Sequence, residues 1–457
     1  MIKLNLYNTI QRRLSIFQPI DTKNVRIYAC GPTVYDFIHI GNARPLVVFD
    51  VLVRLLRKIY PKVTYVRNIT DIDDKINKRA IEKKINISEL TNETIKNFHK
   101  DAHALGNLKP DFEPKATDHI SEMIEMIETL ISNGFAYVSS GNVLFAVEKY
   151  NNYGALSGRS LDEMISGSRV EVAEYKKNPG DFILWKPSSE KLPGWDSPWG
   201  RGRPGWHIEC SAMSKKYLGT QFDIHAGGLD LIFPHHENEI AQSCCANKSD
   251  IMANYWLHNG YVTSDGEKMS KSLGNFATIN NLLLNFRGEA IRYALMQAQY
   301  RAPLSFSKKS LDEATKSLSR LYRAVEGFEV NDGQDTQIID NLCDDLNSPK
   351  ALARLHYLAD EANKGSKECA QKLKNSSNIL GILCNSTDEW FKFGEINSNE
   401  AIENSAMTEK EIDELIIKRK IAKENKEYDK ADQIREQLLK KNIQLEDKPD
   451  RTVWRRL

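Results

Sequence analysis

The 457-residue sequence lacks long apolar runs, and this absence excludes several classes of protein. No stretch approaches the roughly 20 consecutive apolar residues of a membrane-spanning helix. Polar side chains interrupt the first 20 residues, so no secretory signal peptide is visible. We therefore expect a cytoplasmic protein that does not bind a membrane.

Cysteine and excess charge are also scarce. The seven cysteines are an odd number scattered along the chain, which argues against a disulfide framework. The formal net charge is +1, so no overall field attracts nucleic acid, and any such binding must use local patches. Hydrophobic residues make up 41% and charged residues 27%, as in an ordinary soluble protein, and the length allows two or three domains.

The N-terminal region has the pattern of a strand, a glycine turn, a helix and a second strand. These three elements are predicted at residues 25–29, 46–56 and 63–66. Pro45 fits the first turn of the helix. In such units anionic ligands lie at the helix N-terminus, where His39 and Asn42 stand and Gly41 allows close backbone approach. The alternative is that His39 only forms a local hydrogen bond in the turn.

A second phosphate-binding candidate is the run from Lys268 to Ser272. Lys268 and Lys271 alternate with two serines, and Gly266 and Gly274 flank them. Such a segment is typical of a loop that closes over phosphate, because lysine ammonium groups neutralise the charge of leaving pyrophosphate. Read alone, such a run is more often a solvated surface loop.

Sulfur, imidazole and carboxylate groups form a third pattern. His235 and Glu239 are four residues apart, so they lie on one helix face and are able to share a metal ion. Together with Cys30 and Cys210 they would form a zinc-type ligand set. The sequence alone leaves open whether these four residues meet, and buried structural cysteines with a capped helix are the alternative. We interpret the other cysteines as packing residues: Cys244, Cys245, Cys343, Cys369 and Cys384.

Six motifs together resemble those of one family. They occupy residues 30–36, 39–42, 67–75, 205–213, 233–239 and 268–272. In order and separation they are similar to the motifs of cysteinyl-tRNA synthetases, a class I aminoacyl-tRNA synthetase family, and the likeness covers nearly the whole chain. Several long motifs in the right order are more specific than any one of them. The resemblance implies an enzyme that joins L-cysteine to tRNA(Cys) using ATP.

The resemblance also implies one Zn²⁺ in the amino-acid pocket. Its implied ligands are Cys30, Cys210, His235 and Glu239. Zinc prefers a soft thiolate and lowers the pKa of a thiol, so coordination of the substrate sulfur would separate cysteine from the nearly isosteric serine. Four protein ligands leave no open position, so we expect Glu239 to bind weakly or move aside, or the site to expand to five ligands.

Further roles follow from the same resemblance. The residues implied to bind substrate are Gly31, Thr70, Trp206, Gly227, Gly228 and Asp230, with Thr70 and Trp206 beside the cysteine and Asp230 on the ribose of ATP. Packing alone is the alternative for Thr70 and Trp206. His39 and Asn42 should contact the ATP phosphates, and Lys271, supported by Lys268, the pyrophosphate. Mg²⁺ is expected with ATP.

One departure from the family signature is Asn42, which replaces the usual second histidine. An asparagine amide donates hydrogen bonds but never carries a charge. Any role of an imidazolium at this position is therefore in doubt, whereas a role in positioning ATP is not.

The implied fold class is α/β, a Rossmann-like parallel-sheet catalytic domain split by an insertion and followed by an all-α bundle and a small C-terminal domain. We expect the first catalytic half at 1–114, the insertion at 115–204, the second half at 205–262, the signature-loop and tRNA stem-contact region at 263–300, the bundle at 301–400 and an anticodon-recognition domain at 401–457. We expect a monomer.

The C-terminal region carries basic clusters at residues 418–420, 440–441 and 455–456. Such clusters hold backbone phosphates, and Trp454 is a candidate for stacking on an unpaired base. An amphipathic helix is predicted at 428–439. Without the family resemblance, this region would be interpreted as a solvated helical hairpin.

Three other functions compete with this interpretation. A cysteine ligase of mycothiol synthesis has a similar catalytic core, but it would not need the basic helical tail. A zinc-stabilised RNA-binding protein would show no cysteine-dependent exchange of pyrophosphate. A zinc hydrolase would need an open metal-bound water beside Glu237 and Glu239.

Overall fold

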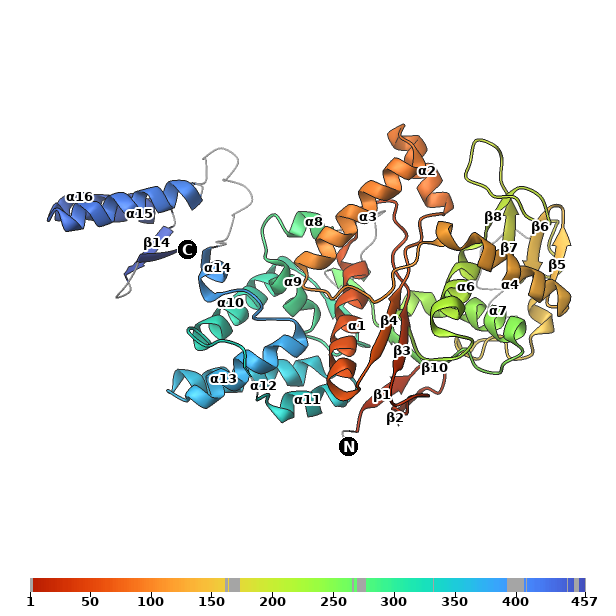
Figure 1. Ribbon diagram of the computed structural model, residues 1–457, viewed down its shortest axis with the longest axis horizontal. Coiled ribbons are helices and arrows are strands. Elements are labelled where there is room, and N and C mark those ends of the chain that lie inside the picture. Colours follow the sequence, from red (N-terminus) through yellow and green to blue (C-terminus); the bar gives the residue numbers. More distant parts are fainter. Residues whose placement is uncertain are drawn as a thin grey trace.

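The computed structural model describes residues 3–160, 163, 173–264, 267–268, 277–331, 333–392, 407, 409–441, 443–447 and 452–456. Figure 1 shows a central sheet with a small sheet-containing region on one side and a group of helices on the other. A C-terminal helical pair lies beyond those helices (Figure 1). Across these residues, no helix has the length and apolar character needed to cross a bilayer.

The central sheet is parallel and has four strands in the order β10–β9–β3–β4. Its strands are β3 (Val25–Ala29), β4 (Val63–Arg67), β9 (Phe222–Gly228) and β10 (Ala253–Asn259). Side chains of a strand alternate between faces, so Ile27 packs into one hydrophobic core and Tyr28 into another. Both faces are therefore covered, as parallel sheets require. The sheet combines two strands from each of two distant chain segments.

Helix α1 (Ile40–Ile59) covers one face of the sheet, and α6 (Trp206–Leu218) and α7 (Glu237–Asn247) belong to the core on the other. Helix α1 begins at Ile40, six residues before the predicted start. His39 caps it, because its Nδ1 accepts the Asn42 N–H at 3.2 Å while Asn42 Oδ1 accepts the His39 N–H at 3.3 Å. Pro45 therefore lies in the helix interior, where one backbone hydrogen bond is missing.

A separate antiparallel sheet lies between the two halves of the central sheet along the chain. Its strands, in sheet order, are β5 (Ala136–Ser139), β6 (Asn142–Phe145), β7 (Phe182–Pro187) and β8 (Gly202–Pro204). Before it come α2 (Asp74–Lys83), α3 (Ile87–Ala104) and α4 (Ile120–Ser132). The hairpin of β1 (Asn5–Asn8) and β2 (Arg13–Ile16) contacts β10.

The second half of the chain is mainly helical. After β11 (Val262–Ser264) and β12 (Glu267–Lys268) come α8 (Ile279–Leu282), α9 (Gly288–Leu295), β13 (Leu304–Ser305), α10 (Lys308–Ala324), α11 (Thr336–Cys343), α12 (Ser348–Asn363), α13 (Lys367–Ser377) and α14 (Thr387–Lys392). Cys244, Cys245 and Cys343 are buried, as packing residues should be, and Cys369 is partly buried. Cys384 is exposed in the loop before α14, so the packing interpretation of this residue is wrong.

The C-terminal elements form a small core of their own. They are α15 (Glu409–Glu424), α16 (Tyr428–Lys440), β14 (Ile443–Asp447) and β15 (Thr452–Arg456). Trp454 is buried in that core, and its indole N–H donates to Asp413 at 2.9 Å. It is therefore a packing residue, and the expectation that it stacks on a base is wrong. Arg419, in a predicted basic cluster, pairs with Asp447 through two contacts of 2.7 and 2.9 Å.

Candidate metal and nucleotide site

The carboxyl end of β3 meets two helices at a cluster of possible metal ligands. Cys30 follows β3, Cys210 lies in α6, and Glu239 lies in the first turn of α7. His235 lies in the turn that leads into α7. The ligand atoms of these four residues lie within 4.8 Å of one another. The structure thus brings together the four residues that the sequence left apart.

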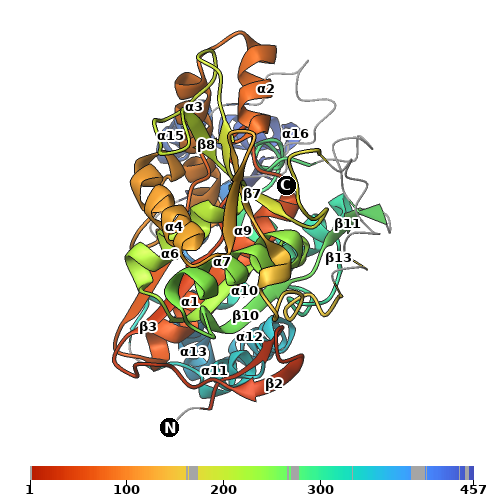
Figure 2. The same ribbon diagram turned by 90° about the vertical axis from the view of Figure 1, so that its right-hand side faces the viewer.

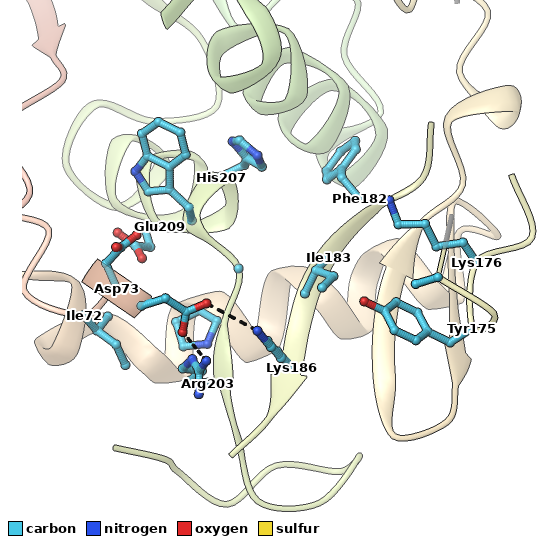
Figure 3. Close-up of a pocket in the computed structure, with 15 residues that line it drawn as sticks. Ile72, Asp73, Tyr175, Lys176, Phe182, Ile183, Lys186, Arg203, His207 and Glu209 are labelled. Carbon is cyan, nitrogen blue, oxygen red and sulfur yellow. Dashed lines mark hydrogen bonds and ion pairs between the residues drawn. The ribbon is translucent and has the colours of Figure 1, made fainter. Parts of the chain in front are cut away.

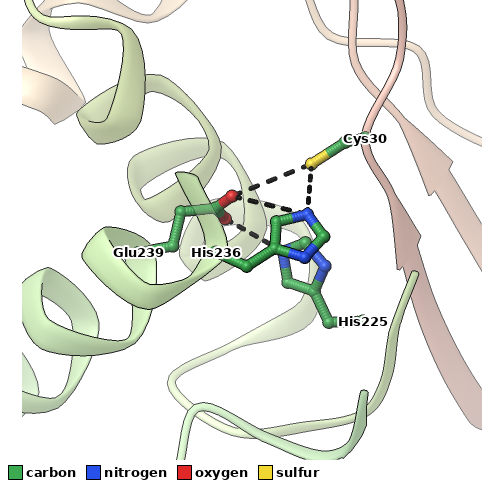
Figure 4. A group of neighbouring side chains, drawn as sticks. All are labelled: Cys30, His225, His236 and Glu239. Atoms are coloured by element: carbon green, nitrogen blue, oxygen red, sulfur yellow. Dashed lines mark hydrogen bonds and ion pairs between the residues drawn. The ribbon is translucent and has the colours of Figure 1, made fainter. Parts of the chain in front are cut away.

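Two further histidines complete an overlapping group. Cys30, His225, His236 and Glu239 also place their ligand atoms within 4.8 Å of one another (Figure 4). One oxygen of Glu239 lies 3.0 Å from His235 Nε2, and the other lies 2.9 Å from His225 Nε2. Cys30 Sγ is 3.4 Å from His236 Nε2. The Glu239 carboxylate is therefore held between two imidazoles.

Sequence reasoning missed His225 and His236. The position of His236 could have been predicted from its spacing. It lies three residues before Glu239, and side chains three residues apart are neighbours on a helix surface. His225 had none, since it lies inside β9 and reaches the cluster only because β9 pairs with β3 in the folded sheet.

Burial governs the electrostatics of the cluster. It raises the pKa of Glu239 and of the Cys30 thiol well above their ordinary values, and neighbouring Cys210 raises that of Cys30 further. Burial also lowers the pKa of His235 well below its usual range and that of His225 to about 3. Neutral imidazoles are the form that binds metal. The donor set of two sulfurs, an imidazole and a carboxylate fits zinc, whose charge would compensate the buried thiolates and carboxylate.

A pocket of about 330 Å³ opens beside the cluster. The predicted residues that line it are Cys30, Gly31, His39, Asn42, Trp206, Gly228 and Asp230. Gly31 is required there, because a Cβ at this position would lie 1.7 Å from the backbone oxygen of Asn68. The pocket also contains Lys75, which sequence reasoning did not single out.

Other predicted residues lie outside this lining. Thr70 is buried, and its hydroxyl donates to Glu209 at 3.2 Å. Gly227 is the last residue but one of β9 and lies beside His236. Lys268 lies in β12, whose side chains the structure does not describe, and Lys271 lies outside the described residues.

Trp206 lines both this pocket and a second one. Its ring stacks on His235 with centroids 4.1 Å apart, and it also lines a cavity of about 370 Å³. Figure 3 shows this cavity beside strands β7 and β8. Lys186 and Arg203 lie in that cavity, and both pair with Asp74.

Glu237 lies between His235 and Glu239 in the sequence, but it accepts backbone hydrogen bonds and does not belong to the candidate metal ligands. Its fully buried carboxylate accepts the backbone N–H groups of Gly154 at 2.9 Å and Ser157 at 2.8 Å, with a longer contact of 3.5 Å to Leu156. Tyr153 donates to Asn238 at 2.5 Å beside it. The carboxylate is thus occupied as a structural acceptor, which argues against a general base of a zinc hydrolase at this position.

Comparisons with known proteins agree with this geometry. Residues 16–316 match the model of the tRNA synthetases class I (C) catalytic domain, and residues 337–385 match the DALR domain. The chain is 50% identical to a "Cysteine--tRNA ligase" of Rhodospirillum rubrum over 99% of both chains. It is 52% identical to one of Gluconobacter oxydans over 99% of this chain and 98% of the other.

A solved structure shows the same fold. Methionyl-tRNA synthetase of Mycobacterium tuberculosis in complex with methionyl-adenylate superposes with a TM-score of 0.58 at 15% identity, covering 78% of this chain and 89% of that one. With a synthetase catalytic domain over most of its length and relatives that match it from end to end, the chain is a ligase that belongs to the cysteine–tRNA ligase family of class I aminoacyl-tRNA synthetases.

Proposed function

We propose that this enzyme activates L-cysteine with ATP to cysteinyl-adenylate and transfers the cysteinyl group to the 3′-terminal adenosine of tRNA(Cys). The observation that carries the proposal is the convergence of Cys30, Cys210, His235 and Glu239 beside a pocket lined by His39 and Asn42. Candidate zinc ligands thus lie next to a helix N-terminus suited to binding phosphate. The relatives named for cysteine and tRNA support the same substrates, and favour them over an amino sugar acceptor.

Selection of cysteine depends on the four-residue cluster. Cys30, Cys210, His235 and Glu239 would hold one zinc ion. When bound, zinc supplies a soft Lewis acid that prefers a thiolate sulfur to a hydroxyl oxygen. One oxygen of Glu239 is already engaged by His225 at 2.9 Å, which supports Glu239 as the ligand that yields to the substrate. The ring of Trp206, fixed by stacking on His235, and Thr70 would bound the amino-acid pocket.

The chain's other residues would position ATP. The N-terminus of α1, with His39 and Asn42, would direct its positive dipole end at the phosphates. Gly228 and Asp230 would hold the adenosine, and Gly31 and Gly227 would leave room for the substrates. Lys268 and Lys271 would neutralise pyrophosphate as it leaves, with Mg²⁺ bound to ATP.

Two displacements make up the reaction. A carboxylate oxygen of cysteine attacks the α-phosphorus of ATP, and the bond to pyrophosphate breaks. A ribose hydroxyl of the tRNA then attacks the acyl carbon, the ester bond forms, AMP leaves with the electron pair of the anhydride bond, and the hydroxyl proton passes to the departing phosphate. Neither step needs a protein nucleophile, because positioning and charge stabilisation carry them.

The remaining segments would serve the tRNA. The insertion at 115–204 joins the two catalytic halves, residues 263–300 carry the signature loop and contact the tRNA stem, the bundle at 301–400 lies along the tRNA, and residues 401–457 recognise the anticodon. A monomeric state and a cytoplasmic location stay predictions.

Exchange of labelled pyrophosphate into ATP tests the proposal with the full-length protein. We expect exchange that depends on cysteine and exceeds exchange with serine by several orders of magnitude. Removal of metal with retained helical circular dichroism should abolish this preference. A metal-free protein that still separates the two amino acids would refute the zinc-based account, and absence of exchange with any amino acid would refute the enzymatic one.

A further inference from the structure

Arg44 is a fully buried arginine on α1, two residues after Asn42. Its Nη1 donates to the carbonyl oxygen of Tyr261 at 2.9 Å, and its Nη2 donates to that of Gln299 at 3.3 Å. Its Nε has no hydrogen-bond partner among the residues that the structure describes. The guanidinium therefore rests on neutral backbone groups alone.

This setting differs from that of the other buried arginines in the described part of the chain. Each of those pairs with a carboxylate: Arg67 with Glu113, Arg203 with Asp74, Arg292 with Asp50 and Arg419 with Asp447. Arg44 has no such partner among the described residues. A buried charge without a counter-charge is costly, so a chain that keeps one needs compensation from elsewhere.

Burial lowers the pKa of Arg44 to about 10, with no neighbouring charge involved. The side chain thus stays positively charged at neutral pH, and deprotonation does not relieve the cost. Negative charge on a ligand outside the protein core would supply the compensation.

The candidate nucleotide pocket adjoins Arg44 and offers a place for that charge. Asn42 and Pro45, on either side of Arg44 along α1, line the pocket, and so does Tyr261, whose carbonyl Arg44 holds. The guanidinium therefore lies directly behind the pocket wall. In this low-dielectric position its field is weakly screened and reaches a ligand that it does not touch.

We propose that Arg44 provides a fixed positive charge that selects a polyphosphate in this pocket, with the triphosphate of ATP acting as its missing counter-charge. The inference rests on the proposed function, because it takes the pocket to bind ATP. Arg44 would act through its field and by positioning the Tyr261 backbone, not by contact with the substrate.

The experiment compares nucleotides that differ only in phosphate number. Affinities of adenosine, AMP, ADP and ATP are measured by calorimetry for the full-length wild type, Arg44→Gln and Arg44→Lys. Glutamine is neutral yet still donates to a carbonyl, whereas lysine keeps the charge. Arg419→Gln is the matched control, since it removes a buried arginine whose charge Asp447 compensates far along the chain.

We expect Arg44→Gln to weaken ATP binding about ten-fold while adenosine affinity changes less than about two-fold, because only the charge-dependent part is lost. Arg44→Lys should retain most of the preference for ATP, and Arg419→Gln should retain all of it. If adenosine and ATP weaken equally in Arg44→Gln, Arg44 merely packs the wall and the inference is overturned.

Two further outcomes are informative. If Arg44→Gln does not fold, the nucleotide affinities of Arg44→Lys test the inference. Retention of the preference for ATP over adenosine supports it, and loss of that preference in this charged variant overturns it. A wild type that binds no nucleotide, or binds adenosine as well as ATP, contradicts the proposed function itself and is seen without any variant.

Discussion

Replacement of Glu237 by glutamine is the sharpest test of how the insertion is fixed to the candidate metal site. Glu237 stands between His235 and Glu239, and its carboxylate accepts the N–H groups of Gly154 and Ser157 at 2.9 and 2.8 Å. Glutamine keeps one acceptor oxygen but turns an amide N–H₂ toward the other backbone donor. One hydrogen bond is therefore lost, and a buried N–H is left facing a second donor.

The size of the effect follows from this geometry. Hydrogen bonds to charged groups contribute about 1.5–3 kcal/mol each, and a buried unsatisfied donor costs a similar amount. We expect Glu237→Gln to lower the free energy of unfolding by about 2–4 kcal/mol. We also expect about ten-fold weaker zinc binding, because the start of α7, which carries Glu239 and follows the turn with His235, is no longer anchored.

Urea unfolding of the metal-free protein measures the first effect, and competition with a chromogenic chelator measures the second. Glu389→Gln is the control, since Glu389 also accepts a backbone N–H, from Ser386 at 2.9 Å, but is exposed. Its substitution should change the free energy of unfolding by no more than about 0.5 kcal/mol. An unfolding free energy for Glu237→Gln that matches the control would refute the reasoning.

Three other perturbations have defined outcomes. Cys210→Ala should lower bound zinc, measured by atomic absorption, and should reduce the preference for cysteine over serine in pyrophosphate exchange; full zinc occupancy would contradict its role as a ligand. Asp101 is 1% exposed, neither of its carboxylate oxygens has a hydrogen-bond partner in the described part of the chain, and burial raises its pKa to about 6. Because the folded protein then binds the proton more tightly than the unfolded chain, the penalty is absent below about pH 4, grows up to about pH 6 and is complete above it. Asp101→Asn should thus raise the free energy of unfolding by about 2 kcal/mol at pH 7.5 and by little at pH 4, as urea titrations at both values will show. Deletion of residues 401–457 should abolish tRNA charging but spare pyrophosphate exchange, and unaffected charging would remove this segment from tRNA recognition.

The sequence predicted elements well where local pattern decides the structure. The limits of β3 were predicted as observed, since its residues are almost all apolar. The start of α1 was predicted too late, because Pro45 resembles a helix beginning and only the mutual hydrogen bonds of His39 and Asn42 show the true cap. Local rules describe what favours a helix start, whereas the start is fixed by a specific pair of side chains.

The candidate site was predictable only in part. Spacing indicated His235 and Glu239 as a pair, but Cys30 and Cys210 joined them through family resemblance. No local signal identified His225, whose contact with Glu239 depends on the order of strands in the sheet. Trp454 shows the opposite failure, since a terminal tryptophan among basic residues suggested RNA, yet it fills a small core.

The ligand cluster draws one member from the opening segment of the chain and three from beyond the insertion, and this has a consequence for biosynthesis. Cys30 leaves the ribosome long before Glu239, so the complete ion-binding set does not exist until more than half of the protein has been synthesised. Metal binding would then require that the two catalytic halves have docked correctly. A nascent chain stalled within the insertion would lack three of the four candidate ligands and would not bind the ion at this site.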